Sequence, residues 1–340
     1  MREQISERQA ACQAAVVGMY SSHPSPSFKD KIAYASRRMP LRLYCCGINE
    51  EDYTEKKLLD AGCGTGEYSS WFASRGAKVT GIDLSDGSLQ EAKKYVESLS
   101  LDNVAFEKRS VLDTGFADGT FDFVYCTGVL HHTPDPFGGL RELTRVLRPG
   151  GKILISLYTS SGFLLREARR QVAKAVGGED LPRRVLCGRR LFPLTTRRLI
   201  RGERNDPQSA LYDYFGIPHE TLHSIGQVLG WFDRLGLEYT GTFPPARIGD
   251  YPAMFAHRGY FSVETEFQSR LGQASRLFTK SATLTPERPG ALSRALVQSI
   301  WFLGRIGVFY IAARKPDVAS ICFHDQGPAQ YQGAQNHYPI

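Results

Sequence analysis

Residues 58–66 read LLDAGCGTG, a short apolar run that ends in an acid and continues into a glycine cluster. Glycines directly after a strand let the backbone turn sharply, and they let a ligand lie against bare main chain. The spacing here is G-x-G-x-G, whereas the dinucleotide-binding fingerprint is G-x-G-x-x-G. The segment therefore predicts a ligand-binding turn and disfavours a nicotinamide or flavin cofactor.

A second acid supports a ligand that contains ribose. Residues 77–83 (AKVTGID) read as the next strand, with Asp83 at its carboxyl end. A carboxylate in this position can accept hydrogen bonds from both hydroxyls of a ribose.

Strand-like and helical patterns alternate over most of the chain. Amphipathic helices are predicted at 89–99, 137–147 and 221–235, and Pro149-Gly150-Gly151 is expected to end the second of them. Alternation of this kind indicates a parallel sheet covered by helices on both faces. The prediction is an α/β fold, a Rossmann-like, doubly wound, mostly parallel seven-stranded sheet with helical insertions. Its strands are expected at 57–60, 77–83, 104–107, 121–127, 152–158, 237–243 and 307–313.

The chain of 340 residues, 42% of them hydrophobic, is long enough for one large domain with insertions or for two domains. Interruptions of the strand–helix alternation suggest the boundaries. The predicted organisation is an N-terminal helical lid segment at 1–55, a core at 56–159, a basic helical insertion at 160–220, a continuation of the core at 221–245, a second insertion at 246–300, the last core strand at 301–316 and a tail at 317–340.

The net charge of +7 is concentrated in one segment. Residues 166–204 hold twelve arginines and lysines against four acids, so the rest of the chain is nearly neutral. Three interpretations stay open: a solvated helical surface, a contact with an anionic small substrate or a membrane surface, and a contact with RNA. Aromatic residues that could stack on bases are scarce in the segment, which argues against RNA.

Several classes of protein are disfavoured by what the sequence lacks. Its N-terminus shows no continuous apolar core followed by a cleavage site, and the apolar stretch 301–313 is too short to span a bilayer. The seven cysteines are odd in number and form no C-x-x-C pair, so neither a disulfide framework nor a metal site is expected. These features predict a cytoplasmic protein without an integral membrane segment.

Four motifs occur in an order and spacing that resemble the class I S-adenosylmethionine-dependent methyltransferases. They are LLDAGCGTG at 58–66, VTGIDLS at 79–85, FADGTFDFVYCTGVLHHTPDP at 116–136 and RVLRPGG at 145–151. The likeness is greatest to type 11-like members that carry GVLHHTPDP. This resemblance implies S-adenosylmethionine as the cofactor.

The resemblance also implies roles for individual residues. Asp83 would bind the ribose, with Leu84 beside it, and Thr127 and Gly128 would lie near the sulfonium. Many relatives carry Gly-Asp where this chain has Arg109-Ser110, so the usual carboxylate near the adenine is either missing or replaced by Asp113. The other implied contacts are to the methionine part, from Asp60, Gly62, Cys63, Gly64 and Gly66, and to the adenine, from Val111 and Leu112.

Candidate catalytic and substrate residues follow the fourth and fifth predicted strands. His131 and His132 lie at the carboxyl edge of the sheet, and one of them is expected to face the site. Methyl transfer is an in-line displacement that needs a base only where the nucleophile arrives protonated, so the pair are candidates for that base. Tyr212, Asp213 and His219 either cover the substrate or form a polar loop.

The sequence thus favours a methyltransferase that acts on a small-molecule or lipid-type acceptor, with the insertions folded over the site. Two alternatives stay open. One is an RNA methyltransferase acting on tRNA through residues 166–204, and the other is a non-catalytic protein that keeps the cofactor-binding fold.

Overall fold

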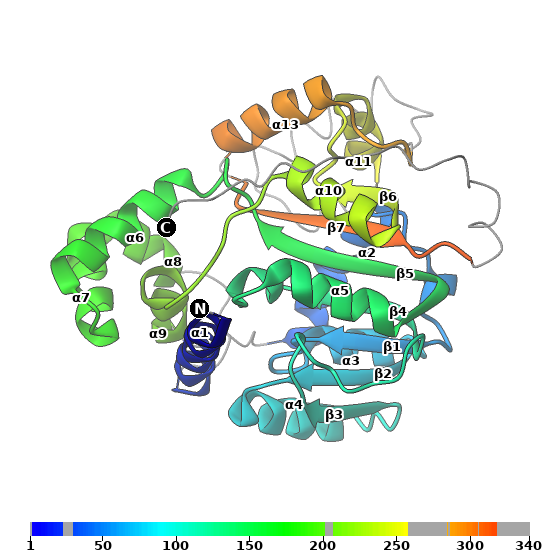
Figure 1. Cartoon of the computed structure of the whole chain (residues 1–340), viewed down its shortest axis with the longest axis horizontal. Helices are drawn as coiled ribbons and strands as arrows, with labels where there is room; N and C mark the ends of the chain where they lie inside the picture. Colours follow the sequence, from blue (N-terminus) through cyan, green and yellow to red (C-terminus); the bar gives the residue numbers. More distant parts are fainter. Residues whose placement is uncertain are drawn as a thin grey trace.

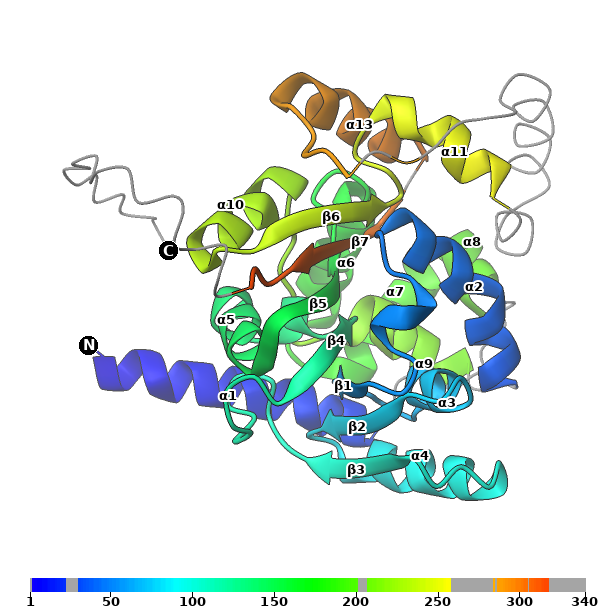
Figure 2. The ribbon, with the colours of Figure 1, turned by 90° about the vertical axis from the view of Figure 1, so that its right-hand side faces the viewer.

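A seven-stranded sheet runs through the structure, a computed structural model that describes residues 2–22, 30–200, 207–257, 284, 286–304 and 306–317. Figure 2 shows the strands fanned in the order β3-β2-β1-β4-β5-β7-β6. Their bounds are β1 Lys57–Ala61, β2 Lys78–Asp83, β3 Val104–Lys108, β4 Phe121–Thr127, β5 Leu147–Tyr158, β6 Glu238–Phe243 and β7 Val308–Arg314.

The first five strands run parallel, and β7 lies antiparallel to both of its neighbours, β5 and β6. This arrangement confirms the predicted mostly parallel seven-stranded Rossmann-like sheet. The strand order reverses between β1 and β4, because β2 follows β1 on one side and β4 pairs with it on the other. Open sheets of this kind bind ligands beyond the carboxyl ends of the strands at such a reversal.

Helices cover both faces of the sheet, as Figure 2 shows. Helices α5 (Pro136–Val146), α10 (Ile225–Leu235) and α13 (Ala291–Gly304) pack in one large core cluster with the strands. Helices α2 (Lys31–Cys45) and α3 (Glu67–Ala73) pack against the opposite face, and α4 (Asp86–Ser98) lies beside β3.

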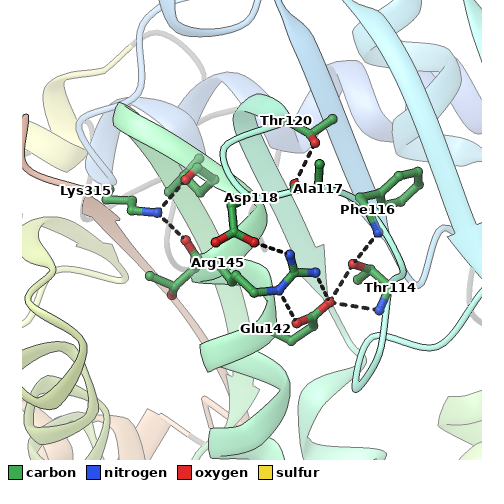
Figure 3. Close-up of polar contacts among 10 residues, drawn as sticks. Thr114, Phe116, Ala117, Asp118, Thr120, Glu142, Arg145 and Lys315 are labelled. Atoms are coloured by element: carbon green, nitrogen blue, oxygen red, sulfur yellow. Dashed lines mark hydrogen bonds and ion pairs between the residues drawn. The ribbon is translucent and has the colours of Figure 1, made fainter.

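Pro149-Gly150-Gly151 was expected to end α5, and this prediction is wrong. The helix ends at Val146 and β5 begins at Leu147, so Gly150 and Gly151 lie inside the strand. The Gly150 amide donates to the Lys315 carbonyl at 2.8 Å, and the Lys315 amide donates to the Gly151 carbonyl at 2.9 Å. The Lys315 ammonium also donates to the carbonyl oxygen of Leu147 (Figure 3). Pairing with the chain beyond β7 therefore holds this segment extended, although its sequence is typical of a turn.

The start predicted for α10 is also wrong. The helix begins at Ile225, and Ser224 caps it by accepting a hydrogen bond from the Gln227 amide. Residues 221–223 instead run alongside the end of β5, where the His223 amide donates to the Tyr158 carbonyl at 2.8 Å. This extended segment links the basic insertion to the edge of the sheet.

The segments predicted as insertions are largely helical where they are described. Residues 160–220 contain α6 (Leu164–Gly177), α7 (Leu181–Leu191), α8 (Pro193–Ile200), α9 (Pro207–Leu211) and a π-helical turn (Tyr212–Gly216). Figure 1 shows this group, together with α1 (Arg2–Ser22), beyond the end to which β5 points. Short 3-10 turns lie at Glu50–Asp52, Leu130–His132 and Ile248–Asp250.

The second insertion ends later in the chain than predicted. It contains α11 (Tyr251–Ala256) and α13, and α13 continues to Gly304, so residues 301–304 are helical rather than part of the last strand. Residues 258–283 of this insertion and residues 318–340 of the predicted tail lie outside the described residues.

A polar cluster fixes the loop between β3 and β4 against α5 (Figure 3). Glu142 accepts hydrogen bonds from the Thr114 amide at 2.9 Å and from its hydroxyl at 2.6 Å. Arg145 donates to Glu142 at 2.8 Å and also contacts Asp118 on the loop. The Arg145 guanidinium and the Thr114 donors together lower the pKa of Glu142 to about 2.

We expect Glu142→Gln to lower the free energy of unfolding at pH 7 by about 1 kcal/mol, since the partner Arg145 is solvent-accessible. A carboxyl with a lowered folded-state pKa stabilises the fold above its unfolded pKa of roughly 4.3, and that contribution is lost as the pH falls toward 2. Urea denaturation at pH 7, 4 and 3 should therefore show the difference between parent and variant shrinking with acid. Glu97→Gln, at an exposed site on α4, is the control, and a difference independent of pH would contradict the assignment.

Candidate active site

A cavity of about 330 Å³ opens at the carboxyl ends of β1, β2, β4 and β5, where the strand order reverses. The glycine turn after β1 and the end of β2 form one side of it, and α1 covers another side. Its lining includes Gly62, Gly64, Glu67, Asp83, Leu84, Ser85, Arg109, Val111, Thr127, Gly128, His132, Ser156, Tyr158 and, from α1, Gln13, Val16, Val17 and Tyr20.

Most of the residues predicted to contact the cofactor lie around this cavity. Those that line it are Gly62, Gly64, Asp83, Leu84, Val111, Thr127 and Gly128. Those that do not line it are Asp60, Cys63, Gly66 and Leu112.

Asp60 is one of the residues behind the lining, and its surroundings are those of a supporting group. Its side chain is 2% exposed and accepts a hydrogen bond from the Ser69 hydroxyl at 2.5 Å. Burial raises the pKa of Asp60 to about 7. The carboxyl therefore ties the end of β1 to α3, the helix that follows the glycine turn.

The glycine turn needs glycine for two different reasons. Gly62, Gly64 and Gly66 have φ angles of 78°, 53° and 82°, in the left-handed region that side chains with a β-carbon avoid. A β-carbon on Gly62 would also lie 2.1 Å from a methyl carbon of Val129. The turn thus presents main chain to the cavity without side chains in the way.

Asp83 is held in place by the backbone around it. One carboxylate oxygen accepts from the Gly64 amide at 3.0 Å and the other accepts from the Ser85 amide at 2.9 Å. Burial raises the pKa of this carboxyl. Each oxygen keeps a further lone pair, so the group can still accept two hydroxyl donors from the cavity.

We expect Asp83→Ala to weaken binding of S-adenosylmethionine by about 1.5–3 kcal/mol, the usual loss for hydrogen bonds to a charged group. Titration calorimetry measures the change. Asp86→Ala, an exposed acid at the start of α4, is the matched control. An unchanged affinity in a folded Asp83→Ala protein would remove Asp83 from the site.

The loop after β3 closes one end of the cavity, and there Arg109 and Ser110 stand where many relatives carry Gly-Asp. Arg109 lines the cavity, pairs with Glu107 at 2.7 Å and lies over the Phe116 ring at 4.4 Å. Asp113 is exposed and is not among the lining residues. The suggestion that Asp113 supplies the missing carboxylate is therefore wrong.

The two adjacent histidines occupy different environments. His132 lines the cavity, and its Nδ1 lies 3.2 Å from the His219 carbonyl oxygen. The His131 ring is fully buried, is not among the lining residues and packs on Tyr158 with ring centres 3.7 Å apart. Burial lowers the pKa of both imidazoles. His132 is thus the member of the pair that can meet a ligand.

Beside His132, the cavity is lined by aromatic rings and one acid. The Tyr20 hydroxyl donates to Asp213 at 3.3 Å, and the Tyr20 ring meets His132 edge-on at 6.0 Å. Of the residues predicted to touch substrate, Asp213 lines this cavity and His219 contributes its carbonyl to His132. Tyr212 instead lines a separate hollow between α1 and α7.

Two arginines of the basic segment are used internally. Arg166 and Arg170 both pair with Glu220, whose side chain is 2% exposed. Arg166 also donates to the Asp213 carbonyl at 3.0 Å. None of the arginines in the described part of 166–204 lines the cavity, so their charge does not face a ligand there.

Tyr20, Tyr158 and Glu67 line the cavity but were not predicted. Tyr158 ends the fifth strand, and its position at the carboxyl edge is a signal that sequence reasoning could have used. Glu67 follows the glycine turn directly and accepts a hydrogen bond from the Thr65 hydroxyl at 2.7 Å. Tyr20 carries no such signal, because α1 has no clear apolar stripe that would fix its docking.

Comparison with known families agrees with this geometry. Residues 59–155 match the methyltransferase domain family. With the sheet order and the glycine turn, this segment is a class I S-adenosylmethionine-dependent methyltransferase domain, and S-adenosylmethionine is the cofactor of that class.

Among curated relatives, an uncharacterised Synechococcus protein is 32% identical over 202 residues, which are 54% of this chain and 48% of that protein. The methyltransferase GfsG of Streptomyces halstedii is 36% identical over 147 residues, 43% of this chain and 52% of that protein. A ubiquinone biosynthesis O-methyltransferase of Pseudomonas aeruginosa is 40% identical over 105 residues, which are 30% of this chain and 44% of that protein. The chain thus spans about half the length of these relatives.

Among solved structures, PKMT2 from Rickettsia typhi superposes with a TM-score of 0.54 at 20% identity. The match covers 85% of this chain and 54% of that one. At this identity the likeness shows a shared fold.

Proposed function

We propose that this chain is an S-adenosylmethionine-dependent methyltransferase that methylates a hydroxyl oxygen of a small-molecule or lipid-type acceptor. One observation carries the proposal. A single cavity joins the glycine turn and Asp83 to a group containing His132, Asp213 and Tyr20. Binding groups for a nucleoside and a candidate base therefore share one cavity.

The residues of the glycine turn fit the proposed cofactor. Gly64 presents bare main chain, Asp83 keeps lone pairs for ribose hydroxyls, and Val111 offers an apolar surface for a base. Thr127 and Gly128 at the end of β4 lie between this region and His132 along the chain. When bound, S-adenosylmethionine supplies an electrophilic methyl carbon, whose bond to sulfur breaks as the acceptor oxygen takes the methyl group.

His132 is placed to remove the proton that the acceptor hydroxyl must lose. The His219 carbonyl can only accept a hydrogen bond, so Nδ1 of His132 carries the ring proton and Nε2 is the basic nitrogen. Burial lowers the pKa of His132, which keeps the ring neutral and able to accept a proton at pH 7. Alignment of the acceptor against the methyl group supplies much of the remaining rate enhancement.

The cavity wall near His132 favours a neutral, partly apolar acceptor. Val16, Val17 and Tyr20 contribute from α1, and Val308 contributes from β7. The charged residue beside them in the lining is the acid Asp213, which disfavours an anionic acceptor. O-methylation is also what the name of the Pseudomonas aeruginosa relative states for that protein.

The proposal is tested by incubating the protein with S-adenosylmethionine that carries a labelled methyl group, together with a lipid and metabolite extract. We expect labelled product whose mass-spectrometric fragments place the methyl on oxygen. Label on nitrogen or carbon would overturn the choice of acceptor atom. Binding of S-adenosylmethionine without transfer to any component would favour the non-catalytic alternative.

A further inference from the structure

Helix α6 turns an apolar face toward solvent. Its exposed apolar side chains recur at positions that share one side of a helix, and they include Leu164, 60% exposed, and Val176, 54% exposed. The full set is Leu164, Leu165, Ala168, Val172, Ala175 and Val176. A helix on a protein surface ordinarily buries such a face, so this orientation needs a cause.

The cause lies on the other side of α6. Arg166 and Arg170 point inward to the buried carboxylate of Glu220, and the Arg166 guanidinium lies over the Phe163 ring at 4.7 Å. Rotating the helix to bury its leucines would leave Glu220 buried and unpaired, which is strongly unfavourable. The ion cluster therefore holds the apolar face outward.

Helix α13 also exposes apolar side chains, although its buried side is apolar as well. Val297 and Trp301 are fully buried in the main core, and the Trp301 indole donates to the Tyr251 hydroxyl at 3.0 Å. The opposite side carries Leu292, 75% exposed, and Leu303, 79% exposed. Leu296, Ile300 and Phe302 are exposed as well.

The turns that carry α6 and α13 touch each other next to the cavity. The turn before α6 packs so closely on the turn after α13 that a β-carbon on Gly162 would lie 1.7 Å from the Ile306 carbonyl oxygen. The Thr159 amide also donates to the Gly307 carbonyl at 2.9 Å. Figure 1 shows α13 along the top of the molecule and α6 on its left-hand side. The first of these turns follows β5 and the second precedes β7. These two strands supply Tyr158 and Val308 to the cavity lining.

Exposed arginines accompany this apolar surface on the neighbouring helices. α7 and α8 carry Arg183, Arg189, Arg190, Arg197 and Arg198, all exposed, and no ion pair within the described residues involves them. Exposed apolar residues lie among them, including Leu194 at 82% exposure. The combination of unpaired cations with solvent-facing leucines is that of an interfacial amphipathic surface.

We propose that the exposed apolar residues of α6 and α13, which we call the outer apolar surface, dock on an anionic lipid bilayer together with the arginines of α7 and α8. Aliphatic side chains enter the boundary between headgroups and acyl chains, and each arginine near the surface adds attraction to anionic lipid. Within the described residues no helix is long and apolar enough to cross a membrane.

Charge decides between this partner and two others. A second copy of the chain seated on the same surface would bring the exposed arginines of both copies together, and like charges oppose such an interface. RNA could bind the arginines, but surfaces that bind RNA usually also present aromatic side chains that stack on bases. Among the exposed large hydrophobic side chains of the described residues, Phe302 is the single aromatic. An anionic bilayer satisfies both the cations and the leucines.

The docking proposal does not depend on the proposed function, but the two fit together. The turns that carry α6 and α13 follow β5 and precede β7, and Tyr158 and Val308 of these strands line the cavity. A lipid-type acceptor could then enter the cavity from the bilayer without crossing water.

The test is flotation of the full chain with two kinds of vesicle, neutral phosphatidylcholine and the same lipid with one third phosphatidylglycerol. We expect the protein to float with the anionic vesicles at physiological salt and to bind the neutral ones at least about tenfold more weakly. Flotation with neither vesicle, or equally with both, would overturn the proposal.

Three variants and one control make the result specific. Val172→Ser with Val176→Ser, Leu292→Ser with Leu303→Ser, and Arg189→Glu with Arg190→Glu should each reduce partition into anionic vesicles by about tenfold or more. Leu99→Ser is the control, since Leu99 is an exposed leucine that follows α4, on the lower side of the molecule in Figure 1. Circular dichroism and cofactor affinity should stay unchanged, because all of these side chains are exposed and lie outside the cavity.

Outcomes that point to another partner are measured with the same variants. Sedimentation that changes from dimer to monomer in the Val172 and Val176 variant would show that a second copy covers the surface. Affinity for tRNA that is lost on Arg189→Glu with Arg190→Glu, without vesicle binding by the parent, would assign the arginines to RNA. Either result would overturn bilayer docking.

Discussion

Gly64→Val is expected to abolish binding of S-adenosylmethionine while leaving most of the fold intact. Gly64 has a φ of 53°, a conformation that costs a β-branched residue of order 1–3 kcal/mol. Because Gly64 lines the cavity, the new side chain would also occupy space that the proposed ligand needs. The two effects together should weaken binding by at least about 100-fold.

Calorimetry with S-adenosylmethionine and S-adenosylhomocysteine measures the loss, with thermal unfolding recorded alongside. The matched control is Gly236→Val at the carboxyl end of α10, where φ is 64° and a β-carbon would meet nothing within 4 Å. That variant should lose stability but bind normally. If Gly64→Val bound normally in a folded protein, the glycine turn would not be the cofactor site.

The elements that sequence reasoning placed best are those whose pattern is local. Strand β4 spans the predicted residues 121–127, and the signal there is a dense apolar run after an Asp-Gly turn. The glycine turn is predicted from its G-x-G-x-G spacing after a strand, and the positive φ angles of its three glycines explain why glycine is favoured there. Signals of this kind belong to the segment itself and need no knowledge of its neighbours.

Features set by distant contacts were not predictable from the same patterns. Nothing in the adjacent sequence of His131 and His132 tells which ring faces the cavity, since this depends on a contact with His219 far along the chain. The direction of α6 depends likewise on Glu220, which buries the arginines and leaves the leucines outside. A helix read from its periodicity alone would be turned the other way.

His132→Asn tests the proposed base directly. The asparagine amide can still donate to the His219 carbonyl, which Nδ1 of His132 faces at 3.2 Å, but it cannot accept a proton at neutral pH. Loss of a general base typically costs about 10²–10⁴-fold in rate, so kcat should fall by that range while affinity for S-adenosylmethionine changes little.

The pH dependence of activity is an independent test of His132 as the base. Burial lowers the pKa of His132, so the ring stays neutral, and the parent stays active, as the pH falls through the ordinary histidine value of about 6.5. Its activity should decline only at more acidic pH, where the ring takes up a proton and can no longer accept one from the acceptor. His132→Asn should lack this titration altogether. His257→Gln, which removes a partly buried histidine outside the cavity, is the control and should keep the parent profile. A His132→Asn protein with the parent's kcat would leave the acceptor proton to another group, and Asp213, which lines the same cavity, would be the next residue to replace.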